Sequence, residues 1–248
     1  METGFAAAER QQSFRGPRGE GAIVFDPTRV PQATPDLLEP AWCGDAAVPV
    51  ASGGRGAAWF VRGAFGDGVL RRYRRGGVAA RISREHYVWL GTNRVRSLAE
   101  FRLLSRLRAL HLPVPAPLVA GWWRVGASYR AAILVQRIAG ARPLAAWLGA
   151  GVDAAPWERA GATIAEFHRH GACHPDLNAN NVLVDAEDRV WLIDFDRGRQ
   201  RDPAAGWRLA NLDRLQRSLV KLSPGEGWRD GWSRLRRAYD RTLAGAVA

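Results

Sequence analysis

The feature that most limits the possible folds of this chain is a group of polar residues set against short aliphatic runs. Residues 174–184 read HPDLNANNVLV, and LIDFDRG follows at 192–198. Carboxylate and amide groups beside strand-like apolar residues are costly unless they are hydrogen-bonded or bind an ion. The DAED segment at 185–188 has the composition of a turn, so the stretch predicts a short β-hairpin next to a polar site.

The polar residues have the spacing of a catalytic loop. His174, Asp176, Leu177 and Asn181 match H-x-D-L-x-x-x-N of protein-kinase-like phosphotransferases, and Asp194 begins D-F-D where those enzymes carry D-F-G. In that chemistry one carboxylate meets the acceptor hydroxyl, while an amide oxygen and a second carboxylate hold magnesium ions that bridge the ATP phosphates. We therefore expect Asp176 to be catalytic, and Asn181 and Asp194 to be metal ligands. The alternatives are turn chemistry alone, or the His-Pro-Asp of J-domain co-chaperones, which a following strand-like NVLV disfavours.

A kinase site also needs groups that hold the nucleotide. The stretch SGGRGAAWFV precedes a predicted strand and can bring backbone N–H groups to the phosphates. Its glycines are Gly53, Gly54 and Gly56. The connector LVQRIAG at 134–140 is the expected hinge, with Gln136 and Ile138 as the residues whose backbone binds adenine.

The cation that grips the α- and β-phosphates must be an arginine, because the one lysine, Lys221, lies beyond the catalytic motifs. In the predicted strand VLRRYRR, Arg71 shares a face with Val69, in the relation that Ala and Lys have in V-A-I-K. Arg72 is the alternative. Arginine binds phosphate bidentately and keeps its charge, so the replacement is chemically workable. A solvated basic strand edge is the competing interpretation.

A helix glutamate should hold that cation. Residues 97–110, SLAEFRLLSRLRAL, predict a helix with an apolar face that includes Leu103, Leu104, Leu107 and Leu110. Glu100 falls on this face, where a buried carboxylate needs a partner. The competing explanation is a capping box, Ser97-x-x-Glu100, in which the glutamate satisfies a backbone N–H.

The order of elements predicts an α+β, two-lobed, protein-kinase-like fold with a small β-rich N-lobe, a mostly helical C-lobe and a cleft between them. We expect an N-terminal extension at 1–50 whose first 20 residues or so are disordered, an N-lobe at 51–135 and a C-lobe at 136–248. The C-lobe should contain a helix at 156–170 that ends at Gly171, the catalytic loop and basic C-terminal helices.

The charge favours an anionic partner. The formal net charge is +12, and all but one of the 36 basic residues are arginine, a bias that a GC-rich genome also produces. Nucleic acid, acidic lipid and phosphorylated substrates all fit such a surface. The tail GWRDGWSRLRRAYDRTL at 227–243 predicts an amphipathic helix, which either lies on anionic lipid or is an ordinary C-terminal helix.

Compartment signals are sparse. No run of eighteen apolar residues occurs, and charges interrupt the N-terminus where an export signal needs an apolar core. Two cysteines, Cys43 and Cys173, suggest no disulfide framework and suit a reducing cytoplasm.

Taken together, GRGAAWFV, LRRYRRGG, EFRLLSRL with LPVPAP, and CHPDLNANNVLVD with LIDFDRG resemble the kinases of 3-deoxy-D-manno-octulosonic acid (Kdo) in the lipopolysaccharide kinase family. The similarity runs from about Gly53 to Gly198. The lack of a glycine in D-F-D separates this family from eukaryotic-type protein kinases. The resemblance implies ATP- and Mg²⁺-dependent phosphorylation of the 4-hydroxyl of Kdo in Kdo-lipid IVA, with Asp176 orienting that hydroxyl.

The resemblance also implies a place in the cell and a set of partners. It implies a peripheral protein on the cytoplasmic side of the inner membrane, acting in lipopolysaccharide core biosynthesis. Its partners would be the anionic glycolipid and the anionic membrane surface, with no nucleic acid and no obligate protein partner. Arg74, Arg75 and Arg197 are the expected substrate contacts.

Other functions stay open at this point. The same fold includes aminoglycoside-type small-molecule kinases and protein kinases, although no A-P-E segment or long activation loop follows Asp194. An inactive kinase-like binding module or a nucleic-acid-binding protein would belong to a different class.

Overall fold

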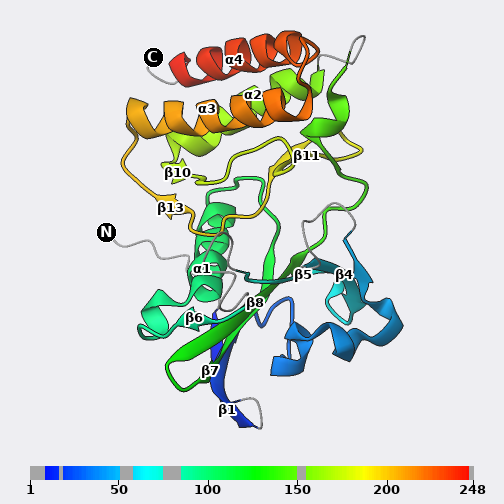
Figure 1. Ribbon diagram of the computed structural model, residues 1–248, viewed down its shortest axis with the longest axis vertical. Helices are drawn as coiled ribbons and strands as arrows, with labels where there is room; N and C mark the ends of the chain where they lie inside the picture. The colour runs from blue at the N-terminus through cyan, green and yellow to red at the C-terminus, as the bar shows by residue number, and fades with distance from the viewer. Residues whose placement is uncertain (1–8, 17–18, 51–57, 75–84, 150–154, 246–248) are drawn as a thin grey trace. The chain divides into compact units, whose positions relative to one another are not determined.

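The computed structural model describes residues 9–16, 19–50, 58–74, 85–149 and 155–245. The chain divides into two compact units (Figure 1). The first contains residues 1–109 and 116–137, and the second contains 110–115 and 138–248.

The first unit is built on an antiparallel sheet, which has eight strands among the described residues. The strand order is β1-β2-β7-β8-β5-β4-β3, and the short β6 also pairs with β8. The strands are β1 (Arg10–Gly16), β2 (Gly19–Phe25), β3 (Val48–Pro49), β4 (Ala58–Gly63), β5 (Gly66–Arg72), β6 (Tyr87–Val88), β7 (Pro117–Val125) and β8 (Ser128–Gln136).

Both faces of the central strands are buried. Strand β7 reads PLVAGWWRV and is buried over its first seven residues, as expected for a strand covered on both sides. Helix α1 (Arg96–Ala109) packs against β7 and β8. The 3₁₀ helix at Pro35–Leu38 also contacts these two strands, and its Leu38 joins the core cluster with Ile23, Leu70 and Leu134.

The N-terminal segment differs from the prediction of disorder over the first 20 residues. Residues 10–16 form β1, which pairs along its whole length with β2, from Arg10 opposite Phe25 to Gly16 opposite Gly19. The polar composition of β1 suggested disorder, but an edge strand needs only backbone hydrogen bonds on one side. The buried residues of β2 anchor the pair to β7.

Helix α1 confirms most of the predicted apolar face. Leu103, Leu104 and Leu107 are fully buried, and Glu100 is buried with them. Leu110, predicted on the same face, is instead 38% exposed, because the helix ends at Ala109 and the chain turns there.

The second unit is mostly helical. Its helices are α2 (Ala155–Arg169), α3 (Ala205–Leu222) and α4 (Arg229–Ala244), with a 3₁₀ turn at Leu144–Trp147. Short strands form two small antiparallel sheets, β12-β11-β9 and β10-β13. These strands are β9 (Arg142–Pro143), β10 (Ala172–Cys173), β11 (Val182–Val184), β12 (Val190–Leu192) and β13 (Arg199–Gln200).

Helices α2 and α4 pack closely, and this corrects one interpretation of the tail. Two glycines allow the approach: a Cβ on Gly161 would lie 2.1 Å from the carbonyl oxygen of Leu235, and one on Gly231 would enter the ring of Trp157. Leu235 and Tyr239 are buried. The apolar face of α4 is therefore part of the core and is not available to a lipid surface.

The α+β class is confirmed, with one sheet-based unit and one largely helical unit. Among the described residues no helix has both the length and the apolar character needed to cross a bilayer.

Candidate active site

The predicted catalytic loop in the second unit is closed by its own hydrogen bonds. The Asp176 carbonyl oxygen accepts hydrogen bonds from the side-chain amides of Asn178 and Asn181, each at 3.0 Å. The Asn180 N–H donates to the Asn178 Oδ1 at 2.9 Å. Because the Asn181 side-chain nitrogen donates to the Asp176 carbonyl, the oxygen of the same carboxamide faces away from that carbonyl. An oxygen in this position can serve as a metal ligand. The Asp176 carboxylate is 48% exposed, so a substrate can reach it.

His174 joins this loop to the hairpin that follows. Its Nδ1 accepts the Asp176 N–H at 3.2 Å, so its Nε2 carries the proton and donates to the Ile193 carbonyl at 2.8 Å. The imidazole is fully buried and packs on the Phe195 ring, with centroids 4.6 Å apart. Burial lowers the pKa of His174, which keeps the neutral tautomer that these two hydrogen bonds need.

The hairpin places Asp194 next to the loop. Strands β11 and β12 pair from Val182 opposite Leu192, and the Ile193 N–H donates to the Asn181 carbonyl at 3.0 Å. Asp194 itself has a φ of 63°, which is uncommon for a residue other than glycine and typical of functional sites. Asp176, Asn181 and Asp194 are thus held on one hydrogen-bonded loop and hairpin.

Asp185, which the sequence marked only as a turn residue, holds that hairpin together. Its Oδ1 accepts the N–H groups of Glu187 and Arg189, and its Oδ2 accepts hydrogen bonds from the side chains of Arg189 and Trp191. Burial raises the pKa of this carboxyl, but the hydrogen bonds from Trp191 and Arg189 outweigh it and the net shift is downward. The turn is therefore fixed by an ionised carboxylate.

In the first unit the predicted arginine–glutamate pair is present. Arg71 on β5 donates from Nη2 to the Glu100 carboxylate, and the Tyr73 hydroxyl donates to its other oxygen. Arg72 pairs instead with Glu39, which decides between the two candidate arginines as the partner of Glu100. The glutamate side chain is 1% exposed and Arg71 is 22% exposed, so the cation keeps one side toward solvent.

The capping-box alternative for Glu100 is wrong. Ser97 lies inside α1, and its hydroxyl donates to the Gly121 carbonyl at 2.9 Å and does not cap the helix. Tyr73 was missed by the sequence reasoning. The alternation of the strand places it on the same side as Arg71, and that signal could have identified it.

The loop and hairpin of the second unit and the arginine–glutamate pair of the first unit both lie in a segment that matches a known family. The family model "Lipopolysaccharide kinase (Kdo/WaaP) family" matches residues 41–239. The chain belongs to this family. Its membership confirms the predicted resemblance, the protein-kinase-like fold and the class of enzyme, a phosphotransferase with an alcohol group as acceptor.

Several relatives within the lipopolysaccharide kinase family are similar over nearly their whole length. The chain is 52% identical over 239 residues to a protein named "3-deoxy-D-manno-octulosonic acid kinase" from Xanthomonas oryzae pv. oryzae (strain PXO99A), covering 95% of this chain and 96% of the relative. Proteins with the same name show 52% identity in Stenotrophomonas maltophilia (strain R551-3) and 51% in Xanthomonas campestris pv. campestris (strain B100), with the same coverage.

The other predicted nucleotide contacts of this family member stay predictions. Gly53, Gly54 and Gly56 lie outside the described residues. The Gln136 N–H donates to the Ala116 carbonyl at 2.8 Å, so only its carbonyl could serve adenine. Ile138 lies just after β8 and is half-buried.

Of the three arginines predicted to contact the substrate, two lie within the described residues. Arg75 lies outside the described residues. Arg74 pairs with Glu85 at 3.1 Å. Arg197 is exposed, three residues after Asp194, and has a φ of 61°.

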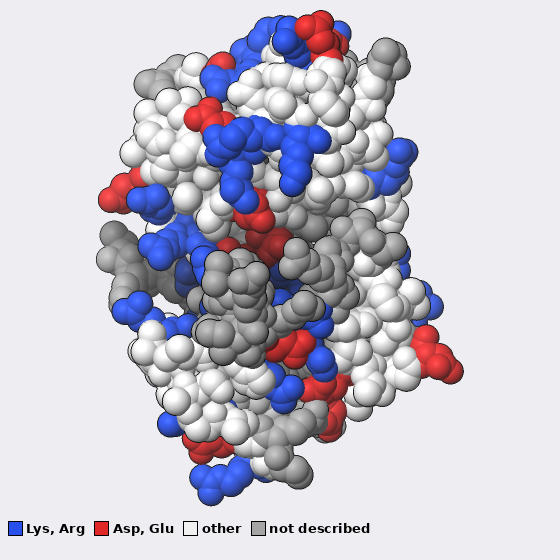
Figure 2. Space-filling model, viewed as in Figure 1, with Lys and Arg blue, Asp and Glu red and all other residues white. Residues whose placement is uncertain are grey.

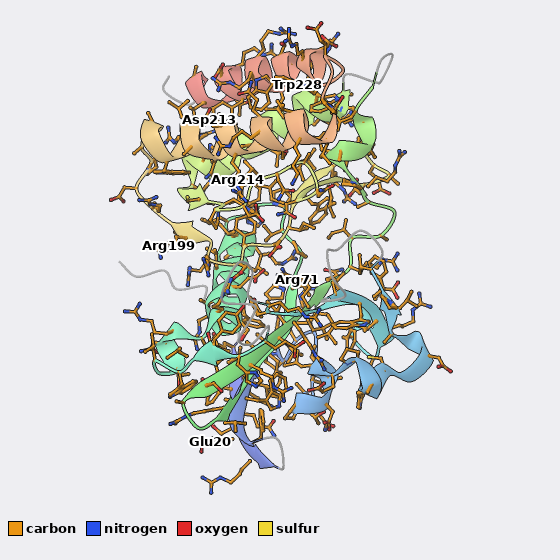
Figure 3. All side chains as sticks on the ribbon, viewed as in Figure 1. Glu20, Arg71, Arg199, Asp213, Arg214 and Trp228 are labelled. Atoms are coloured by element: carbon orange, nitrogen blue, oxygen red, sulfur yellow. The ribbon has the colours of Figure 1, made fainter. Side chains whose placement is uncertain are left out.

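One residue beside Asp176 was not predicted. Arg214 on α3, which is labelled in Figure 3, donates from both Nε and Nη2 to the Asp176 Oδ1, with the Nε bond at 2.8 Å. It lies 38 residues beyond Asp176 in the sequence, and no motif marks it.

Proposed function

We propose that this protein transfers the γ-phosphoryl group of ATP to the 4-hydroxyl of Kdo in Kdo-lipid IVA, as a step of lipopolysaccharide core biosynthesis. The relatives that cover 95% of the chain are named for kinase activity on this sugar acid. The observation that carries the proposal is the loop and hairpin that hold an exposed Asp176 together with Asn181 and Asp194.

Asp176 would accept a hydrogen bond from the acceptor hydroxyl and orient it for attack. Its backbone is fixed by Asn178, Asn181 and His174, so its carboxylate needs little reorganisation. A general base must lie within hydrogen-bond reach of the proton that it takes, and the exposure of Asp176 permits that approach.

Asn181 and Asp194 fit a magnesium site of the kinase type. Magnesium prefers oxygen ligands and is usually bound through one or two carboxylates together with substrate phosphates. When bound, the ion supplies charge neutralisation at the transferring phosphoryl group.

The first unit would supply the contacts to the nucleotide. Arg71, steadied by Glu100, would bind the α- and β-phosphates with the part of its guanidinium that faces solvent. The backbone of Gly53, Gly54 and Gly56 would approach the phosphates, and the backbone of Gln136 and Ile138 would contact adenine. The buried glutamate would hold the arginine in place, as the lysine–glutamate pair does in kinases.

We place the protein on the cytoplasmic side of the inner membrane as a peripheral protein. The net charge of +12 favours an anionic lipid surface and an anionic glycolipid acceptor. Binding of the positively charged protein to anionic lipid would bring the enzyme to its lipid-linked acceptor.

The test is phosphate transfer from radiolabelled ATP with magnesium. Kdo-lipid IVA is the acceptor, and an aminoglycoside and casein are the control acceptors. We expect label in the lipid alone, with the modified position assigned to the 4-hydroxyl by NMR. Asp176→Asn should lower the rate by about 10²–10⁴-fold, as expected for loss of a general base, without changing the circular dichroism spectrum.

Other outcomes separate the parts of the proposal. Transfer to the aminoglycoside or to casein, with none to the lipid, would overturn the substrate and leave the kinase class standing. Transfer that persists in Asp176→Asn would overturn the role of the loop.

A further inference from the structure

Helix α3 is fastened to the catalytic loop along one face. The Asn211 Oδ1 accepts the His174 N–H at 3.0 Å, and the Ser218 Oγ accepts the Ala179 N–H at 3.0 Å. Arg214 lies between these two positions on the same face of the helix, because residues three or four apart are neighbours on a helix surface. The position of Arg214 beside Asp176 is therefore fixed by contacts on both sides of it.

The ion pair between Arg214 and Asp176 contributes little to folding. Both side chains are about half exposed, at 47% and 48%, and exposed ion pairs typically contribute about 0–1 kcal/mol. Helix α3 is already anchored by the buried Leu212, Leu215 and Leu219. A functional reason for placing a cation against the catalytic carboxylate is the better explanation.

The guanidinium of Arg214 can bind a second anion without releasing Asp176. It has five N–H donors, and its contacts with Asp176 use Nε and Nη2 on a single carboxylate oxygen. The remaining donors have no partner among the described residues. When the acceptor hydroxyl lies within hydrogen-bond reach of Asp176, other polar groups of the same acceptor molecule lie close to Arg214.

Basic residues continue from Arg214 along the exposed side of α3. Arg217 and Lys221 follow at i+3 and i+7, both are exposed, and neither has an ion pair within the described ranges. Figure 2 shows Lys and Arg side chains gathered over this helix. On helix α4, Arg234 and Arg236 each pair with an acidic residue one turn away on the same helix.

We propose that Arg214 is an acceptor-binding residue that recognises the carboxylate of a sugar acid while it holds Asp176. Arg217 and Lys221 extend this site along α3 toward further anionic groups of the acceptor. The inference rests on the proposed function for the identity of the acceptor, since a sugar acid carries its carboxylate on the same ring as the hydroxyl that is phosphorylated. A planar guanidinium suits such a group because it binds carboxylates bidentately.

The first test pairs enzyme variants with acceptor variants. Kinetics of the wild type and R214Q are compared on the natural acceptor and on one whose carboxylate is reduced to a primary alcohol. We expect R214Q to lower kcat/KM for the natural acceptor by about tenfold or more, the loss typical of a charge-assisted hydrogen bond. The KM for ATP should stay unchanged, and R214Q should cause little further loss on the reduced acceptor.

Controls separate recognition from folding. R214K should recover part of the activity, because it restores the charge and loses the bidentate geometry. R237Q, at an exposed arginine of α4, should behave as wild type. An equal loss on both acceptors, or no loss on either, would overturn the inference.

A second measurement does not depend on turnover. Calorimetry of free Kdo binding to the full-length protein should show about tenfold weaker binding in R214Q, with unchanged binding in R237Q and equal unfolding midpoints in all variants. If the wild type transfers no phosphate to the lipid, the proposed function fails, and this comparison still decides the role of Arg214. Equal Kdo affinity in the wild type and R214Q would refute it.

Discussion

A buried histidine should make this protein sensitive to mild acid. His168 on α2 is 1% exposed, and its Nδ1 lies 2.8 Å from the hydroxyl of Tyr239 on α4. Burial lowers the pKa of His168 from 6.5 to about 4. The unfolded chain therefore binds a proton at this position below pH 6.5, whereas the folded chain does so only near pH 4. The free energy of unfolding must fall as the pH falls through this window.

The size of the effect follows from the two pKa values. A difference of one pKa unit corresponds to about 1.4 kcal/mol, so the full window between 6.5 and 4 is about 3 kcal/mol. Between pH 7 and pH 5 the linkage relation gives a loss of about 2 kcal/mol from this one group. That is a substantial part of the stability of a typical domain, which is about 5–15 kcal/mol.

The assay is urea unfolding at pH 7, 6 and 5, followed by tryptophan fluorescence. His168→Gln removes the titrating group, so its loss of stability between pH 7 and pH 5 should be about 2 kcal/mol smaller than that of the wild type. His174 is also buried with a lowered pKa and contributes equally to both proteins. Tyr239→Phe is the matched control: it keeps His168 buried and should keep the acid sensitivity. Identical pH dependence in the wild type and His168→Gln would refute the reasoning.

Four other perturbations have defined outcomes. Glu100→Ala leaves Arg71 and the buried Tyr73 without their carboxylate partner and should lower the free energy of unfolding in urea by about 3 kcal/mol, with a raised KM for ATP. A cost below about 0.5 kcal/mol would argue against an ion pair at a buried glutamate. Gly161→Ala places a Cβ against the backbone of α4 and should destabilise the fold by about 1–3 kcal/mol in thermal melts, whereas Gly206→Ala, which meets nothing within 4 Å, should not. Removal of magnesium with EDTA should abolish phosphate transfer, and Asp194→Asn should nearly abolish it. Full activity in either case would contradict the proposal that Asp194 is a magnesium ligand.

Local spacing explains why much of the site could be read from the sequence. The loop and hairpin span fewer than 25 residues, so the distances between Asp176, Asn181 and Asp194 are largely fixed by chain geometry. Strand alternation and helix periodicity were also sufficient to propose that Arg71 and Glu100 meet.

The features that were missed depend on contacts between distant segments. Residues 10–16 look polar, and only the pairing of β1 with β2 makes them a strand. The tail is amphipathic, but its periodicity does not say whether lipid or α2 covers its apolar face. Arg214 reaches Asp176 because α3 folds back over the loop, which no spacing rule predicts.

The fastening of α3 to the loop has an evolutionary consequence. The groups proposed to sense the acceptor project from one helix, whereas the proposed magnesium ligands belong to the loop and hairpin. On this proposal, substitutions at exposed positions of α3 alter which anionic sugar is accepted. They leave the residues for phosphate transfer unchanged. Libraries randomised at positions 214, 217 and 221, with Asn211 and Ser218 kept, are the natural starting point for redirecting such an enzyme to new acidic sugars.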